Sequence, residues 1–430
     1  MLRTFRPRHV MLGVALLFTT MLISACSALP GEGWANFTVD GQYIYVAYQA
    51  YVFRVNTGTT GTPGNTGVVD WAAKAPNGAH MYTAPALGKN GLIYVGAYDK
   101  EAYAFTLQPP NRSERVASWD SPTAIDKFVS NPVINEELGM VYFGHADKGI
   151  YAYDMTTGAE KAKFTDMNFG VWGTPLLDVE SNTLYVPSLD HHLYALDPAT
   201  LAKKWDIDTS GALYASPTMI DGKLYIGTFT GDFLQIDPES QKITNSLKTN
   251  GGLWATPLLE AGLLYFGDLK GNLYAVDLST FTIKYSATDT ENFGAVRGKM
   301  VAADTPPIEG TPSERLIFVA SENKSLRAYT PDLQIRYRQT TEDRILSDLV
   351  MVGDKLVFTT LSDNQLLVGY NLLPFVEAWR VKKPTDDDVK LFANMTIDIT
   401  APTTQPTAEA TAEATSEATS AATAEATASQ

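Results

Sequence analysis

Short apolar runs alternate with polar turns along most of the chain, and the pattern repeats about every forty residues. Residues 251–277, GGLWATPLLEAGLLYFGDLKGNLYAVD, closely match residues 211–237, GALYASPTMIDGKLYIGTFTGDFLQID. Each stretch contains three runs of strand-like residues, separated by turns rich in Gly, Asp and Asn, which supply the positive φ angles of tight hairpins. The pattern predicts repeated antiparallel hairpins.

One aromatic position gives the length of the repeat. It recurs eight times with steps of 40 to 53 residues, and we call these residues the reference aromatics: Tyr45, Tyr94, Tyr142, Tyr185, Tyr225, Tyr265, Phe318 and Phe358. An apolar run precedes each reference aromatic. This run often begins with an aromatic residue and has a proline three places later, as in Trp172 and Pro175. A fourth run follows the third and carries another aromatic. Four short strands in each of eight units predict an all-β fold, an eight-bladed β-propeller of four-stranded antiparallel blades.

The start of the chain has the layout of a secretory signal. Arg3, Arg6 and Arg8 precede an apolar run, and Ile23-Ser24-Ala25-Cys26 resembles the lipobox of bacterial lipoproteins. The resemblance implies cleavage after residue 25 and lipidation of Cys26, which would hold the protein on a membrane through its acyl chains. The alternative is an ordinary cleavage site that happens to lie near a cysteine.

Charge and cysteine content narrow the function classes. The chain has a formal charge of −15, and loss of residues 1–25 with their three arginines leaves 30 Lys and Arg against 48 Asp and Glu, or −18. This balance argues against nucleic acid and anionic lipid headgroups as partners. Because Cys26 is the sole cysteine, its lipidation would leave no thiol for a disulfide, a metal thiolate or a catalytic nucleophile.

The repeats resemble the quinoprotein-type repeat, Ala-x-Asp-x-x-Thr-Gly-x-x-x-Trp. Ala195, Asp197, Thr200 and Trp205 match this pattern with Leu201 in place of glycine; Ala275, Asp277, Thr280 and Tyr285 match with Phe281 in place of glycine. The resemblance implies that the fourth-strand aromatics dock between adjacent blades, and Trp205, Tyr285 and Trp379 are the residues assigned this structural role. Within this repeat family, the whole chain is similar to the lipid-anchored propeller subunit of the outer-membrane β-barrel assembly machinery.

The end of the chain differs from the repeats. Residues 389–399 alternate apolar and polar positions and predict one long strand that pairs where the last blade meets the first; an exposed amphipathic linker is the alternative. From Ala408 onward the chain is a low-complexity Ala-Glu-Thr sequence, which predicts a disordered tail. The predicted divisions are a signal peptide (1–25), a lipidated linker (26–33), the propeller (34–400) and the tail (401–430).

Few residues in the sequence suggest catalysis or metal binding. His191-His192 suggests a metal site, but a solvated turn is favoured because adjacent strand residues point opposite ways; Asp386-Asp387-Asp388 suggests calcium, but a solvated linker is favoured. No serine–histidine–aspartate set, phosphate-binding loop or zinc-protease helix is recognisable. We therefore assign no catalytic, cofactor-binding or metal-binding residue and no cofactor.

The sequence thus favours a non-catalytic protein-binding scaffold, with proteins and the lipid bilayer as expected partners and the propeller as a monomer in the bacterial cell envelope facing the periplasm or the exterior. Two alternatives stay open: an oxidoreductase that depends on pyrroloquinoline quinone or a metal, and an extracellular ligand-binding sensor. Three longer connections, near residues 57–69, 108–118 and 305–314, are predicted to cluster on one sector of one rim and to form the partner-binding surface. The alternative is that these insertions have no function and vary freely, because longer surface loops cost little stability.

Overall fold

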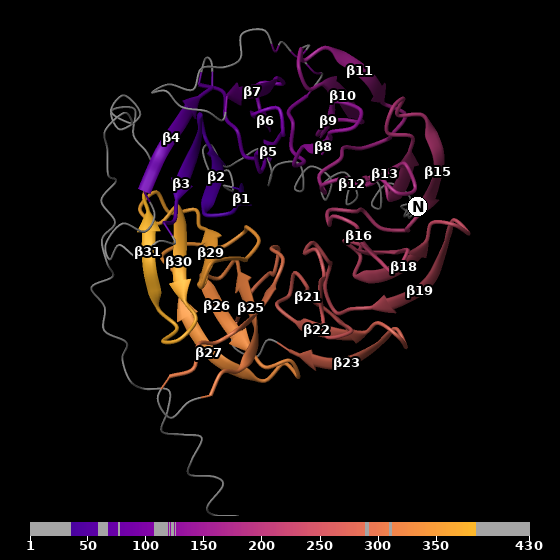
Figure 1. Ribbon diagram of the computed structural model, residues 1–430. Helices are drawn as coiled ribbons and strands as arrows, with labels where there is room; N and C mark the ends of the chain where they lie inside the picture. Colours follow the sequence, from indigo (N-terminus) through magenta and orange to yellow (C-terminus); the bar gives the residue numbers. More distant parts are fainter. Residues whose placement is uncertain are drawn as a thin grey trace, which may run out of the picture.

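The computed structural model describes residues 36–383, apart from 59–67, 76–77, 107–118, 120, 122–123, 125, 289–291 and 309–311. These residues form eight antiparallel sheets arranged in a ring around a central channel (Figure 1). The predicted eight-bladed, all-β propeller is therefore confirmed. Lipidation at Cys26, the strand at 389–399, the acidic run at 386–388 and the tail lie outside the described residues.

The first four blades follow the chain in order. Blade 1 contains β1 (Asn36–Asp40), β2 (Tyr43–Tyr48), β3 (Tyr51–Asn56) and β4 (Val68–Lys74); blade 2 contains β5 (Ala86–Leu87), β6 (Leu92–Gly96) and β7 (Ala102–Thr106). Blade 3 contains β8 (Val133–Asn135), β9 (Met140–Gly144), β10 (Ile150–Asp154) and β11 (Glu160–Phe164); blade 4 contains β12 (Leu176–Asp178), β13 (Thr183–Pro187), β14 (His192–Leu196) and β15 (Lys203–Asp208).

The remaining blades continue in the same way. Blade 5 contains β16 (Thr218–Ile220), β17 (Lys223–Gly227), β18 (Asp232–Asp237) and β19 (Lys242–Lys248); blade 6 contains β20 (Leu258–Glu260), β21 (Leu263–Gly267), β22 (Leu273–Asp277) and β23 (Thr282–Ala287). Blade 7 contains β24 (Val301–Asp304), β25 (Arg315–Ser321), β26 (Ser325–Tyr329) and β27 (Ile335–Thr340); blade 8 contains β28 (Val350–Val352), β29 (Lys355–Thr359), β30 (Leu367–Asn371) and β31 (Glu377–Val381).

The described part of blade 2 forms a three-stranded sheet, and most residues between β7 and blade 3 lie outside the described part. Trp119 is fully buried, and its indole NH donates to the carbonyl of Asp154 in blade 3. The Ser121 hydroxyl hydrogen-bonds to both backbone groups of Ala102 in β7. Ser121 thus holds this connection against β7.

The hydrophobic core is divided among the eight interfaces between blades. Each of the eight clusters of buried residues draws its members mainly from two adjacent blades. All eight reference aromatics are buried, with at most 2% of their surface exposed. Because a four-stranded sheet is buried on both faces only when it has a neighbour on each side, the ring must close for every blade to be covered.

The quinoprotein-type pattern corresponds to one local structure. Ala195 lies opposite Trp205 across β14 and β15, with a register shift directly after Ala195. The Asp197 carboxylate then accepts hydrogen bonds from the backbone NH groups of Ala199 and Thr200. Leu201, which replaces glycine, has a φ of 55°. The pattern therefore encodes a bulge, a capped turn and one left-handed residue.

Leucine and phenylalanine tolerate this left-handed position because their side chains are buried. Leu201 and Phe281, with φ of 55° and 52°, expose only 1% and 6% of their surface and pack against the preceding blade. The left-handed conformation costs about 1–2 kcal/mol, whereas burial of a large apolar side chain contributes about 1.5–3 kcal/mol. Burial therefore offsets the backbone cost at both positions.

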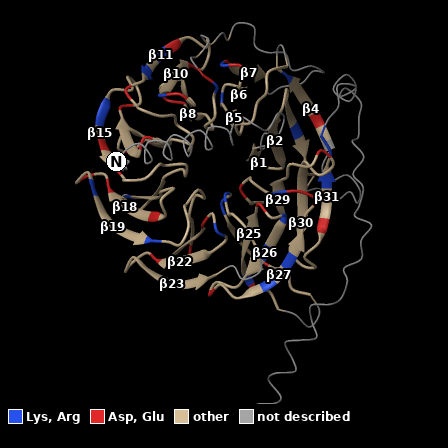
Figure 2. Ribbon diagram, turned by 180° about the vertical axis from the view of Figure 1, so that it is seen from behind, with Lys and Arg blue, Asp and Glu red and all other residues tan. Residues whose placement is uncertain are grey.

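The outermost strand of each four-stranded blade is the exposed edge of its sheet. Acidic and basic residues lie along these strands (Figure 2), including the exposed Lys242 and Lys248 on β19. An unpaired edge can recruit a strand from another molecule, and charged side chains oppose this. The outer rim of the propeller is thus protected against edge-to-edge association.

Adjacent blades are also joined by hydrogen bonds from reference tyrosines. Tyr94, Tyr142 and Tyr265 each donate from the hydroxyl to a carbonyl in the next blade, at Met155, Pro198 and Pro331. Burial raises the pKa of Tyr142 to about 12, so that the hydroxyl keeps its proton and remains a donor. Reference residues of blades 7 and 8 are phenylalanines and cannot make this bond.

Replacement of Tyr142 with phenylalanine should lower the free energy of unfolding by about 1–2 kcal/mol, because the Pro198 carbonyl loses its donor at 2.8 Å. Urea denaturation followed by circular dichroism measures the change. Tyr225→Phe is the matched control, since that hydroxyl bonds Gln235 within its own blade and Gln235 is partly exposed. A loss at Tyr142 no larger than at Tyr225 would contradict a specific inter-blade role.

Candidate functional site

The two faces of the ring are defined by the connections between strands. The first strand of every blade begins on one side, where the turns between second and third strands also lie; we call this the entry face. The other side, the far face, carries the turns between first and second strands and between third and fourth strands. The described chain enters at Asn36 and ends after β31, both at the entry face.

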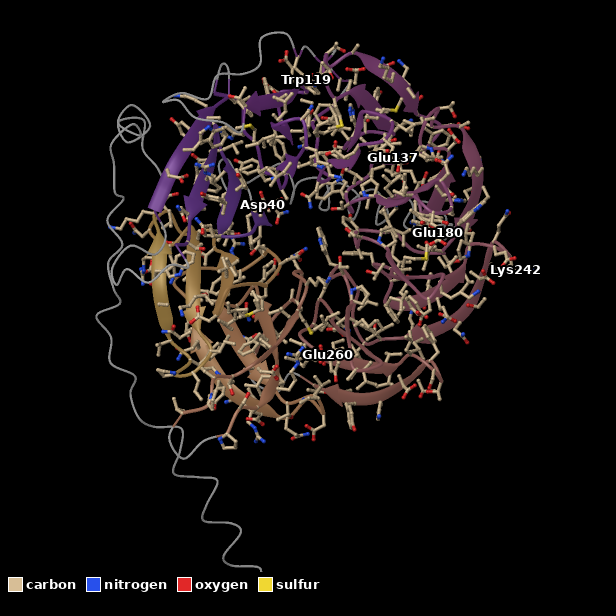
Figure 3. The ribbon with its side chains drawn as sticks, viewed as in Figure 1. Asp40, Trp119, Glu137, Glu180, Lys242 and Glu260 are labelled. Atoms are coloured by element: carbon tan, nitrogen blue, oxygen red, sulfur yellow. The ribbon has the colours of Figure 1, made fainter. Side chains whose placement is uncertain are left out.

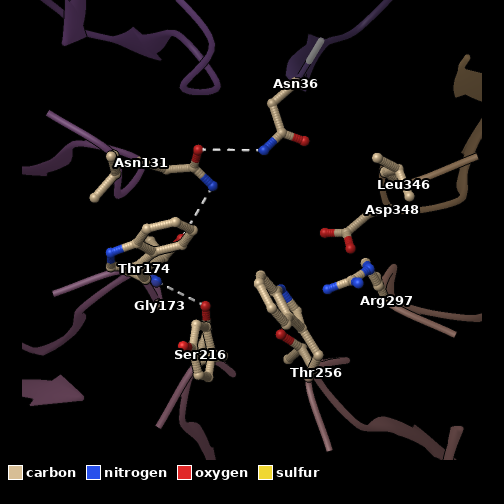
Figure 4. A pocket seen from close by; sticks show the side chains of 13 residues that line it. Asn36, Asn131, Gly173, Thr174, Ser216, Thr256, Arg297, Leu346 and Asp348 are labelled. Atoms are coloured by element: carbon tan, nitrogen blue, oxygen red, sulfur yellow. Dashed lines mark hydrogen bonds between the residues drawn. The ribbon is translucent and has the colours of Figure 1, made fainter. Parts of the chain in front are cut away.

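A cavity of about 120 Å³ occupies the entry end of the channel (Figure 4). Residues just before or at the first strands of seven blades line it, and these include Asn36, Asn131, Trp172, Tyr214, Trp254, Arg297 and Asp348. Ligand pockets for drug-sized molecules usually measure about 300–1,000 Å³. The cavity is therefore small, and it opens into the channel.

A stack of aromatic rings forms one wall of the cavity. Trp254 lies against Tyr214, with ring centres 4.4 Å apart, and the Arg297 guanidinium lies 4.5 Å above the Trp254 ring. Trp172 meets Trp254 edge-on at 6.3 Å. The Arg297 Nε also pairs with Glu322 at 2.6 Å. Because Tyr214 and Arg297 lie on Trp254, this wall is already packed with protein groups.

Hydrogen bonds link neighbouring blades around the channel at one repeated position. The backbone NH of Thr174 donates to the Ser216 hydroxyl at 2.9 Å, and the Asn131 amide donates to the Thr174 hydroxyl at 3.0 Å. In the last two blades the Lys299 backbone NH donates to Asp348 at 2.6 Å. The polar side chains of the cavity thus have a structural role in holding blades together.

Asp348 adds a negative charge where Ser216 has a hydroxyl. Desolvation by nearby protein groups raises the pKa of Asp348 from its ordinary value, against the lowering effects of the hydrogen bond from the Lys299 backbone NH and of the Lys299 charge. The carboxylate is the single acidic side chain lining the cavity.

The cavity does not suit a quinone held by calcium, the cofactor pair of one open alternative. Calcium takes six to eight oxygen ligands, commonly several carboxylates, whereas the lining contains one carboxylate. Among the residues that the structure describes, no group of three or more histidine, cysteine, aspartate or glutamate side chains is placed to hold a metal. The donor set of the cavity therefore does not fit this cofactor pair.

The predicted metal candidate at His191 and His192 is a turn. His191 is exposed with a φ of 77°, and His192 Nδ1 lies 2.8 Å from the Asp206 carboxylate. Lys203 bonds the other oxygen of the same carboxylate at 2.9 Å. The two histidines therefore have different environments and do not converge on one point.

Sequence reasoning missed one buried histidine. In five blades a buried polar side chain near the start of the turn between second and third strands hydrogen-bonds to backbone groups: Ser188, Thr228, Asp268, Ser321 and Thr360. Blade 3 has His145 there, fully buried, and neither ring nitrogen has a hydrogen-bond partner. Alignment of the eight units at this position would have revealed the exception.

Aromatic rings hold His145 in an apolar setting. It stacks on Tyr151 at 4.1 Å and meets Phe128 edge-on at 4.2 Å. The nearest acidic group is Asp147, 3.6 Å from Nδ1. Burial lowers the pKa of His145 to about 3, because the charged imidazolium would lose its hydration without gaining a good partner.

The far face is acidic around the channel. In every blade except blade 2, a carboxylate lies at the end of the first strand or in the turn after it; these residues form the acidic ring, which consists of Asp40, Glu137, Glu180, Asp221, Glu260, Asp304 and Asp354. Arg315 pairs with Glu260 and Asp304, and Lys355 pairs with Asp354. Figure 3 shows four residues of the acidic ring spaced around the channel. Leu138, Val179 and Ile308 lie among them with 41%, 56% and 49% of their surface exposed. The far face thus combines negative charge with exposed aliphatic groups.

The three assigned docking aromatics lie at interfaces between blades. Trp379 of blade 8 is 1% exposed and packs with residues of blade 1. Trp205 and Tyr285 are half-buried and pack with blades 5 and 7, respectively. The three long connections end on the far face by topology, but residues 59–67, 107–118 and 309–311 lie outside the described part, and so their clustering stays a prediction.

Comparison with known proteins agrees with this architecture. Residues 123–287, which include blades 3 to 6, match the family model described as "Outer membrane protein assembly factor BamB". No curated protein sequence is significantly similar to the chain.

Several solved structures share the fold. BamB from Moraxella catarrhalis is 17% identical with a TM-score of 0.55, and the match covers 77% of this chain and 92% of that one. The computationally designed Ika8 protein is 11% identical with a TM-score of 0.60, covering 81% and 97%; Saccharomyces cerevisiae Sqt1 is 10% identical with a TM-score of 0.59, covering 77% and 93%.

The fold and the repeat structure define an eight-bladed propeller of the quinoprotein-repeat class. Within that class, residues 123–287 are similar to the BamB family, and the described chain shares the propeller fold of BamB.

Proposed function

We propose that this protein is a lipid-anchored, non-catalytic scaffold of the bacterial cell envelope, which binds protein partners as an outer-membrane assembly factor does. The family match over blades 3 to 6 supports the assembly-factor class. In this proposal residues 1–25 are removed, Cys26 carries the acyl chains, and the propeller faces the periplasm or the exterior. Within the described residues, no helical segment combines the length and apolar character needed to cross a bilayer.

The scaffold proposal rests mainly on the composition of the far face. Exposed aliphatic side chains at Leu138 and Val179 lie beside the carboxylates of Glu137 and Glu180, all on short turns between strands. Apolar contacts across an interface provide affinity, and a surface with mostly negative charge favours partners with positive charge. The far face therefore suits a protein surface that carries basic residues around an apolar centre.

Charge reversal on the far face tests this proposal. The double variant Glu137→Lys/Glu180→Lys should lower capture of partners from detergent-solubilised envelope membranes at least about tenfold, because like charges then face a basic partner. Cross-linking and quantitative pull-down at two salt concentrations measure the loss, which should shrink at high salt.

Asp166→Lys is the matched control, since Asp166 is an exposed carboxylate in a connection at the entry face. Capture by this control should stay close to that of the unchanged protein. Equal capture by the double variant and the unchanged protein would refute the assignment of partner binding to the far face.

A further inference from the structure

The position of Asn36 fixes where the chain leaves the propeller toward Cys26. Asn36 is the first residue of β1 and lines the cavity at the entry end of the channel. Residues 27–35, nine in all, separate it from Cys26. Ten Cα-to-Cα steps span at most about 35 Å when fully extended. If Cys26 carries the acyl chains, as the proposed function requires, the bilayer surface lies within this distance of the channel mouth.

This reach favours the entry face over the far face as the side that meets the membrane. A route around the ring crosses three strand spacings of about 4.8 Å and then descends a strand of five or six residues, about 17–20 Å. Side chains on the outer strand and on both faces lengthen the route further. A tether on this route would be almost fully extended when it reached the far face, and such extension is entropically costly, so contact through the entry face or its adjoining rim is favoured.

Two exposed phenylalanines on the entry face distinguish between these orientations. Phe169 lies in the connection between blades 3 and 4 with 62% of its surface exposed, and Phe229 lies in the turn after β17 with 38% exposed. Among the described residues, the other large apolar side chains that are exposed are all aliphatic. Aromatic and other apolar side chains on a rigid face favour the interfacial region of a bilayer.

The backbones of both phenylalanines are fixed by hydrogen bonds. The Ser188 hydroxyl of blade 4 donates to the Phe169 carbonyl at 3.2 Å. The Phe229 backbone NH donates to the Ala212 carbonyl at 2.8 Å, and its ring lies 4.9 Å from Tyr214 at the cavity. Because their backbones are fixed, the two rings are presented on one face without the ordering cost of a mobile loop.

The charges of the far face favour the same orientation. Arg315 and Lys355 offset part of the charge of the acidic ring. A bilayer surface that carries negative charge would still repel the carboxylates of Glu137, Glu180 and Asp221, whereas the entry face carries cationic side chains such as Lys148 and Lys270 among its carboxylates. From the tether, the two phenylalanines and this distribution, we propose that the entry face lies against the bilayer with Phe169 and Phe229 in its interfacial region. The far face then points away from the membrane, toward its partners.

The orientation can be measured because Cys26 is the sole cysteine and would be acylated. A fluorophore is attached to a cysteine at Thr230→Cys, beside Phe229, or at Ser181→Cys on the far face; both positions are exposed. The full-length lipoprotein is reconstituted in phosphatidylcholine vesicles that contain nitroxide-labelled headgroups. Quenching at position 230 should exceed quenching at position 181 several-fold.

A double variant tests the phenylalanines. Phe169→Ser/Phe229→Ser should remain with the vesicles on flotation, since the acyl chains hold it, but its quenching at position 230 should fall toward that at position 181. The matched control Leu138→Ser/Val179→Ser changes two exposed apolar side chains of the far face and should leave the quenching unchanged.

The outcomes separate this inference from the proposed function. Vesicle binding by a Cys26→Ser variant equal to that of the lipoprotein would refute the lipid anchor itself. A lipoprotein that floats with the vesicles but shows equal quenching at both positions would overturn only the orientation. Loss of partner capture in the phenylalanine variant, with quenching at position 230 unchanged, would assign the two rings to a protein contact and also overturn it.

Discussion

Replacement of Trp379 with alanine should lower the free energy of unfolding by about 3–5 kcal/mol, the range for removal of a large buried aromatic side chain. Trp379 is 1% exposed and fills the interface between blade 8 and blade 1. Seven interfaces are between blades that follow one another in the chain, but in the described residues no covalent connection joins blade 8 to blade 1. Loss of packing there should therefore open the ring as well as leave a cavity.

Urea denaturation and limited proteolysis at neutral pH measure both effects. Trp205→Ala is the control, because Trp205 occupies the corresponding position in blade 4 but is half-buried, at an interface that the chain itself bridges. The control should lose about half as much stability and should gain no new protease sites in blades 8 and 1. Equal losses for the two variants would contradict a special role for the closing interface.

The residue opposite Trp379 provides a second test of the same packing. A β-carbon on Gly369 would lie 2.2 Å from Trp379 Cε2, closer than non-bonded atoms approach. Gly369→Ala should therefore also destabilise the protein, and combination with Trp379→Ala should cost less than the sum of the two changes. Additive losses would show that the two residues do not share one packing constraint.

Acid should destabilise the protein through His145. The unfolded histidine has an ordinary pKa near 6.5, and burial lowers the folded pKa to about 3. Above pH 6.5 both states are neutral and the group has no effect on stability. As the pH falls below 6.5, the unfolded state binds a proton that the folded state does not. Stability should then decrease by about 1.4 kcal/mol per pH unit until about pH 3.

The variant His145→Ser isolates this effect, because blade 4 has Ser188 at the corresponding position. Between pH 7.5 and pH 4.5, the unchanged protein should lose about 2–3 kcal/mol more stability than the variant. Urea midpoints across this range provide the measurement, and His191→Asn, which removes an exposed turn histidine, is the control. A variant with the same pH dependence as the unchanged protein would show that His145 is solvated or paired when the protein is folded.

Periodicity in the sequence was sufficient to predict the ring. The reference aromatics and the turn residues recur because each blade must bury both faces and reverse direction three times. The same sequence pattern is therefore present eight times. The connections of irregular length were harder to predict, as after β7, where the Ser121 hydroxyl bonds to the backbone of Ala102.

Features that depend on several blades together, or that break the repeat in one blade, could not be predicted in this way. Trp172 belongs to a repeated aromatic position, but only the ring geometry brings it together with Tyr214 and Trp254 at the channel. His145 follows no pattern, since it replaces small polar residues at a buried position. The exposure of Phe169 and Phe229 likewise depends on the neighbouring blades, which no single repeat contains.

Every described blade consists of one uninterrupted stretch of chain, without a strand exchanged between neighbours. Most backbone pairings therefore join residues close in sequence, and such local contacts form rapidly. A polypeptide that emerges from a ribosome or a secretion pore from its amino end can build each sheet in turn on the one before it. Only the meeting of the last sheet with the first must wait until synthesis or export has passed residue 381.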